Sequence, residues 1–132
     1  MPIVPTNPIE KDLALACQAE GFGTLGQDLF YGQFPSLPDE CIAVIISSGR
    51  MTIHSTKHTS ILTILIRGKN YSEVSQIVRN IVEFFHGQAN ILIGDHNIGF
   101  IRSERLPIHV GKDPQGRHIL SAEFSLDDIE II

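Results

Sequence analysis

The sequence lacks several features that would assign a protein to a class at once. No apolar run approaches the roughly 20 residues that a membrane-spanning helix needs. The first residues, MPIVPTNPIEK, hold no basic segment followed by an apolar core, so we expect no secretory signal. Only two cysteines are present, Cys17 and Cys41, too few for a disulfide framework. We therefore predict that both are small buried thiols.

Charge is also scarce in this chain. Charged residues make up 19% of it and the formal net charge is −5, which argues against a protein that coats nucleic acid. Hydrophobic residues make up 42%, so the chain does not have the composition of a disordered one. With 132 residues it is long enough to bury about two-thirds of its unfolded surface. These values predict a single domain over residues 1–132.

The clearest local pattern is a strand, a turn and a helix over residues 61–87. Apolar residues dominate 61–67, which predicts a strand covered on at least one face. Asn70 is placed to cap a helix, and Glu73 at the third helical position suits a capping box. Gly87 provides the stop. Between them, one apolar stripe recurs at helical spacing: Val74, Ile77, Val78, Ile81 and Phe85.

The other elements follow from shorter signals. A first helix is predicted from a cap at Asn7 and a proline at the first helical position, Pro8, to a stop at Gly21. In residues 119–126 the alternation predicts a core face made of the even-numbered positions. Strands are predicted over 28–34, 41–47 and 91–93, and a final hairpin has its arms over 98–110 and 117–126.

The predicted order of elements is α-β-β-β-α-β-β-β. Two amphipathic helices packed on one face of a mostly antiparallel or mixed sheet is the simplest arrangement that buries both apolar stripes. Residues 48–60 show no period and many turn formers, so we predict a long loop there, either mobile or held by a partner. The fold class is therefore predicted to be α+β.

The six histidines are the obvious place to look for chemistry, and they give no site. His54 and His58 have the spacing of a zinc-binding helix, but their segment is predicted to be a loop and no glutamate follows His54. His109 and His118 can face each other across the final hairpin, which predicts a cross-strand contact. We expect no metal and no cofactor.

The leading enzyme alternative concerns the N-terminus. Without the initiator methionine, Pro2 would be an N-terminal amine like that of tautomerase-type enzymes, a general base if its pKa were lowered. Those enzymes need the proline at the head of a strand, whereas Pro5 and Pro8 break any strand here. Asp95 and His96 are adjacent in a predicted turn, where aspartate usually bonds its own backbone. We therefore predict no catalytic residues and no enzyme.

Several short blocks recur in an order and spacing that fit a known family. The strongest are LIRGKNY at 65–71, which leads into the second helix, and GKDPQGRH at 111–118 in the final hairpin. Others lie at 19–26, 35–38 and 121–124, so that the blocks span most of residues 13–126. Together they resemble the tail-terminator or minor capsid proteins of tailed bacteriophages.

The resemblance implies a structural virion protein whose helices pack on one face of a mixed sheet. Such proteins form hexameric rings that cap the tail tube and offer a docking surface to the head connector, while DNA passes through the lumen. The implied partners are copies of itself, the tube protein and the head-completion or connector protein. The implied location is the virion tail or neck, with assembly in the bacterial host cytoplasm. The alternatives are a head-completion or neck protein of the same particle and a small-molecule-binding domain with an apolar pocket.

Three regions are the candidate interfaces of such a ring. Residues 48–60 mix polar and apolar side chains and can order on assembly. The hairpin turn GKDPQGR, at 111–117, carries charges of both signs. The turn into the second helix, at 67–71, presents basic residues. The residues predicted to contact neighbours are Arg50, Met51, Ile53, His54, Lys57, His58, Arg67, Lys69, Tyr71, Lys112, Asp113 and Arg117.

Overall fold

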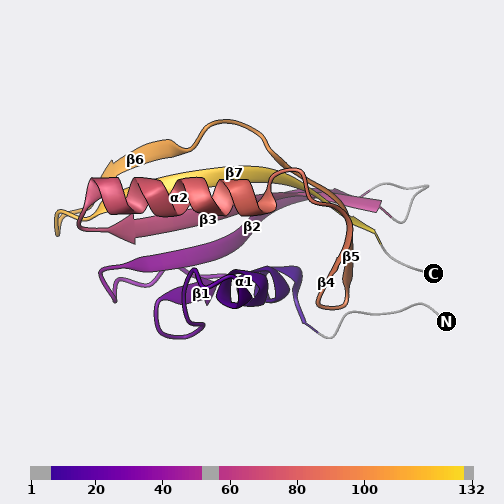
Figure 1. The fold of residues 1–132 in the computed structure, drawn as a ribbon, viewed down its shortest axis with the longest axis horizontal. Helices are drawn as coiled ribbons and strands as arrows, with labels where there is room; N and C mark the ends of the chain where they lie inside the picture. The colour runs from indigo at the N-terminus through magenta and orange to yellow at the C-terminus, as the bar shows by residue number, and fades with distance from the viewer. Residues whose placement is uncertain (1–6, 52–56, 130–132) are drawn as a thin grey trace.

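The computed structural model describes residues 7–51 and 57–129. Within them, seven strands form one curled sheet and two helices pack against it (Figure 1). The α+β class predicted from the sequence is confirmed. None of the described helices is long and apolar enough to cross a membrane. The elements are α1 (Ile9–Ala19), β1 (Leu29–Tyr31), β2 (Cys41–Met51), β3 (Lys57–Gly68), α2 (Tyr71–Phe85), β4 (Ala89–Ile93), β5 (His96–Ser103), β6 (Ile108–Lys112) and β7 (His118–Ile129).

The sheet is mixed, with the strand order β1-β2-β3-β7-β5-β4 and with β6 also paired to β7. The β1–β2 pair is parallel and the other pairs are antiparallel. At its centre β3 and β7 pair over their full length, from Lys57 opposite Ile129 to Gly68 opposite His118. The second edge of β7 is shared, because β5 pairs with its C-terminal half and β6 with its N-terminal half.

Both helices pack on one face of this sheet, as predicted. α1 lies over β1 and β2, whereas α2 lies over β3 and β7. In β7 the side chains of Leu120, Ala122, Phe124 and Leu126 are buried, which confirms the core face predicted from the alternation. Cys17 is fully buried and Cys41 nearly so, and burial raises the pKa of the Cys17 thiol to about 12. The core includes Leu13, Ile42, Val44, Leu62, Ile64, Ile66, Val74, Val78, Ile81, Phe85, Leu120, Ala122, Phe124 and Leu126.

Two sequence predictions about strands were wrong. The arm expected over 98–110 is two strands, β5 and β6, so four strands follow α2. Pro107 lies between them and has no N–H to donate to a strand ladder. The loop expected over 48–60 is largely a hairpin, because β2 continues to Met51 and β3 begins at Lys57. Backbone pairing needs no apolar alternation, so the sequence of these polar strand ends does not indicate a strand. Residues 52–56 lie outside the described residues.

The helix starts differ in how well they were predicted. The Asn70 side chain accepts the backbone N–H of Glu73 at 3.1 Å, so the predicted cap of α2 is confirmed. In α1, by contrast, Pro8 is the N-cap residue, and its side chain makes no capping hydrogen bond. Asn7 was predicted as this cap, but its amide instead donates to the Asp12 carboxylate at 3.2 Å. That contact belongs to a polar pair described below.

Candidate functional site

Arg67, at the end of β3, is one of two buried arginines that fix loops to the face of the sheet opposite the helices. Its neighbour Ile66 faces the core, so strand alternation directs Arg67 to the opposite face, where it is 4% exposed. Its guanidinium donates to the backbone carbonyls of Pro38 at 2.6 Å and Asp39 at 3.3 Å. It also lies over the ring of Phe34, 4.7 Å from the centroid. Arg67 therefore fastens the loop before β2 onto the sheet.

Arg117, just before β7, is the second buried arginine and is also 4% exposed. Its Nε donates to the Asp113 carboxylate at 2.7 Å, and its Nη1 donates to the Ser36 carbonyl at 2.5 Å. Nη1 also lies 3.3 Å from the Asp39 carboxylate. Asp113 accepts two further hydrogen bonds, from the backbone N–H groups of Gln115 and Arg117, both at 3.0 Å. The hairpin turn is thus built around this one guanidinium.

Both carboxyls of this arrangement are held in their charged form. The hydrogen bond from Lys69, with Nζ 3.0 Å away, lowers the pKa of Asp39, and the charges of Lys69 and Arg117 add to it. Desolvation acts to raise the pKa of Asp113, but the hydrogen bonds and charge of Arg117 outweigh it and leave that pKa below its ordinary value.

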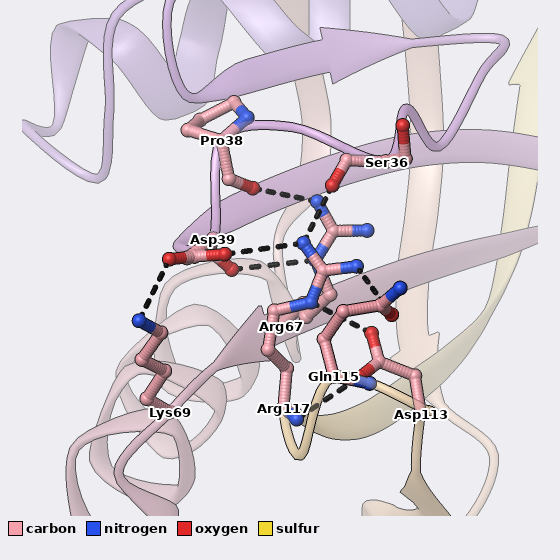
Figure 2. Close-up of polar contacts among 8 residues, drawn as sticks. All are labelled: Ser36, Pro38, Asp39, Arg67, Lys69, Asp113, Gln115 and Arg117. Atoms are coloured by element: carbon pink, nitrogen blue, oxygen red, sulfur yellow. Dashed lines mark hydrogen bonds and ion pairs between the residues drawn. The ribbon is translucent and has the colours of Figure 1, made fainter.

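These contacts form what we call the arginine cluster, and Figure 2 shows how its side chains converge. It joins three segments, the loop around 36–39, the end of β3 and the β6–β7 turn, which are far apart in the sequence. They coincide with three of the blocks that carry the family resemblance, at 35–38, 65–71 and 111–118. The cluster consists of Ser36, Pro38, Asp39, Arg67, Lys69, Asp113, Gln115 and Arg117.

The predicted interface residues fall into three groups in the structure. Arg67 and Arg117 are buried and bind their own chain, whereas Lys69, Tyr71 and Lys112 are exposed and Asp113 is half-buried. Contact of these residues with a neighbour stays a prediction. Of the others, Arg50 and Met51 end β2 and Lys57 and His58 begin β3, whereas Ile53 and His54 lie outside the described residues.

Next to the arginine cluster, His109 and His118 face each other across the β6–β7 hairpin, as predicted. His118 Nδ1 lies 3.2 Å from His109 Nε2, so one ring donates to the other. The Tyr71 ring, at the start of α2, packs edge-on against both, with centroids 5.2 Å and 5.4 Å away. Desolvation, followed by the charges of Lys112 and His109, lowers the pKa of His118 from its ordinary value of 6.5.

This lowered pKa predicts a small loss of stability in acid. As the pH falls through about 6.5, the unfolded chain binds a proton at His118 before the folded chain does, so the free energy of unfolding falls. His118→Gln should therefore show a smaller drop in Tm between pH 7.5 and pH 5.5 than the wild type. Proton NMR titration should place the His118 pKa below 6.5, and Lys112→Gln should move it back upward. An unchanged pH dependence in His118→Gln would contradict this assignment.

A buried Asp12–His96 pair joins α1 to the start of β5. His96 Nε2 lies 3.5 Å from the Asp12 carboxylate and 2.9 Å from the Asn7 carbonyl, and both side chains are almost fully buried. Sequence reasoning considered His96 only beside Asp95 and missed Asp12. A signal was present, because Asp12 lies three residues after Ile9 and four before Ala16, within the apolar stripe of α1.

Beside this pair an open groove of about 520 Å³ runs between α1 and β4. Its walls are mostly apolar, and the Asp12 carboxylate at its side is already held by His96 and Asn7. It therefore lacks the convergent polar groups of a small-molecule site. Within residues 7–51 and 57–129, no group of three or more His, Cys, Asp or Glu side chains is placed to hold a metal ion. The groove is lined in part by Leu15, Ala16, Ala19, Phe84, Ile91 and Leu92.

The family comparison decides the class of this protein. A family model described as bacteriophage tail terminator protein matches residues 17–127. The chain belongs to the bacteriophage tail terminator family. The resemblance drawn from the sequence is thus confirmed, and the chain is a structural protein of a phage tail. No curated protein matches it significantly.

Two solved structures share the fold of this chain at low sequence identity. A chain from the virion of a native gene transfer agent particle is 8% identical, with a TM-score of 0.56 over 76% of this chain and 78% of that one. A second solved structure, which carries no functional name, is 11% identical, with a TM-score of 0.58 over 91% of this chain and 89% of that one. At these identities the likeness shows the fold alone.

Proposed function

We propose that this tail terminator caps the end of the tail tube as a ring, stops its growth and provides the docking surface for the head connector. The observation that carries the proposal is the family match over residues 17–127. The proposed partners are copies of the chain, the tube protein and a connector or head-completion protein, and the proposed place of assembly is the host cytoplasm. The tautomerase alternative rests on Pro2, which lies outside the described residues.

The character of the surface supports a role in self-association and docking. Large apolar side chains are exposed on β6 and β4, and exposed apolar patches on a folded protein usually mark contacts with other macromolecules. The arginine cluster, in contrast, directs its buried guanidinium groups to carbonyls and carboxylates of its own chain. We assign it to holding the hairpin turn and the loop before β2 in place.

Passage of DNA through the proposed ring needs little attraction to phosphate. The net charge of −5 favours this, since phosphate binding depends on clustered Lys and Arg side chains. Asp127 accepts a hydrogen bond from the Thr59 hydroxyl at 2.9 Å, on the central β3–β7 pair. Asp128 also belongs to β7, and Glu130 lies outside the described residues. We propose that acids face the lumen and keep the DNA free of tight contacts.

Electron microscopy with tail tubes assembled from the tube protein of the same phage tests this function. We expect the purified protein to form rings, seen as one oligomeric species by sedimentation velocity, and to decorate tube ends in negative-stain images. If the protein instead decorates isolated head connectors and leaves the tube ends bare, the head-completion alternative is indicated. A protein that stays monomeric at high concentration and leaves tube ends bare would overturn the proposal.

A further inference from the structure

An exposed apolar row begins at Leu106, just before β6, and continues along β6, at an open edge of the sheet. Leu106 is 86% exposed, Ile108 42% and Val110 61%. β6 pairs only with β7, so its other edge has no strand partner among the described residues. Natural proteins usually protect such an edge with charges, a proline or a covering element, because an open apolar edge invites association. We call these three residues the β6 row.

The groove between α1 and β4 offers a matching surface. Leu92, which lines it from β4, is itself 65% exposed, and Ala16 and Ala19 line it from α1. Small residues on one wall and an exposed leucine on the other leave an apolar recess open to another chain. Burying the row in this recess would remove apolar surface from water on both sides.

The two surfaces are placed so that one chain cannot cover its own row. Figure 1 shows β6 along the upper side of the molecule, beyond α2, and α1 with β4 along the lower side. A contact between two different patches of the same chain is head-to-tail, and such contacts repeat around a ring when the rotation between copies closes.

Arginines lie beside the β6 row, and an acid lies at the groove. Arg102 and Arg105, both exposed, precede the β6 row in the chain, and Glu20 lines the rim of the groove. Each arginine holds a glutamate of its own chain through Nη2, Glu104 at 3.3 Å and Glu123 at 2.6 Å. A guanidinium has five N–H donors, so others can reach the acid of a neighbour. Opposite charges at the edge of an interface favour one orientation over others.

We propose that neighbouring copies meet head to tail, with the β6 row of one copy in the α1–β4 groove of the next and Arg105 near Glu20. This inference rests on the ring of the proposed function and names the surfaces that form it. The occupant is a second copy because the groove and the row are complementary in polarity and in charge, and both belong to this chain.

Site-directed cross-linking tests this pairing. The double variant Leu106→Cys, Ala19→Cys should give a ladder of oligomers on a non-reducing gel after mild oxidation, up to the size of the ring. Mixing the two single variants should give dimers only. The native Cys17 and Cys41 are 0% and 2% exposed, so they should contribute little background. A matched control, Leu106→Cys with Gln76→Cys on the exposed side of α2, should give no ladder.

A second variant separates this inference from the function on which it rests. Leu106→Asp should weaken ring assembly at least tenfold while leaving Tm nearly unchanged, because the side chain is exposed in the single chain. The head-to-tail pairing would be overturned if the wild type forms rings but the Leu106→Cys, Ala19→Cys variant gives no ladder. It would also be overturned if Leu106→Asp assembles as strongly as the wild type. In both cases the capping function would still stand. Cross-linking of Leu106→Cys to itself would show a two-fold contact and overturn the head-to-tail pairing as well. A wild-type protein without rings would overturn both.

Discussion

Replacing Arg117 with methionine should lower the free energy of unfolding by about 2–4 kcal/mol. The guanidinium is buried and bonds the Asp113 carboxylate and the Ser36 carbonyl, with Asp39 3.3 Å away. Methionine fills similar space but donates nothing, so it leaves a half-buried carboxylate and a carbonyl without their charged partner. Urea denaturation followed by circular dichroism measures the loss.

An exposed arginine is the matched control for this substitution. Arg105 makes a comparable ion pair with Glu123 at 2.6 Å, but its side chain is largely in solvent. Arg105→Met should therefore cost at most about 1 kcal/mol, as exposed ion pairs do. If Arg117→Met costs no more than Arg105→Met, the arginine cluster does not hold the fold together in the way we describe.

The pH dependence gives Arg117→Met a second readout. The folded-state pKa of Asp113 lies below its ordinary value, so its contribution to stability is present above about pH 4 and is lost as the pH falls further. Arg117→Met removes the side-chain hydrogen bond and the charge that help to lower this pKa, while the backbone N–H of residue 117 stays in place. The decline in stability between pH 5 and pH 3 should therefore be shallower in Arg117→Met than in the wild type.

What the sequence could predict was set by how local each signal is. The cap at Asn70 and the alternation along β7 depend on residues within a few positions, and both predictions are confirmed. His109 and His118 were predicted to meet because a hairpin brings them together nine residues apart. The resemblance added what local signals do not contain, since it depended on the order of blocks over most of the chain and the family match confirms it.

The contacts that were missed join distant parts of the chain through groups that leave no pattern. Arg67 bonds backbone carbonyls 28 and 29 residues away, and because every residue has a backbone carbonyl, the sequence does not mark these two as its partners. Asp12 and His96 are brought together only when the turn between β4 and β5 packs on α1. The polar ends of β2 and β3 pair through the backbone, so side-chain periodicity did not reveal them.

Gly94→Ala is the substitution that tests the Asp12–His96 pair, and it should cost about 2–4 kcal/mol. Gly94 has a φ of +58°, where an L residue pays about 1 kcal/mol or more. A Cβ there would also lie 2.3 Å from Cγ and Oδ2 of Asp12. The carboxylate cannot move aside freely, because it is buried and held by Asn7 and His96. Thermal and urea unfolding measure the cost.

Gly87→Ala isolates the backbone part of this effect. Gly87 has a φ of +88°, but no atom lies within 4 Å of the place that an alanine methyl would take, so only about 1 kcal/mol of backbone strain is expected. The excess cost of Gly94→Ala then measures the displacement of Asp12. In an Asp12→Ala background that excess should vanish, because the clash is gone, and the two glycine substitutions should cost the same. An excess that persists without the Asp12 carboxylate would show that the turn between β4 and β5 is constrained by something other than this pair.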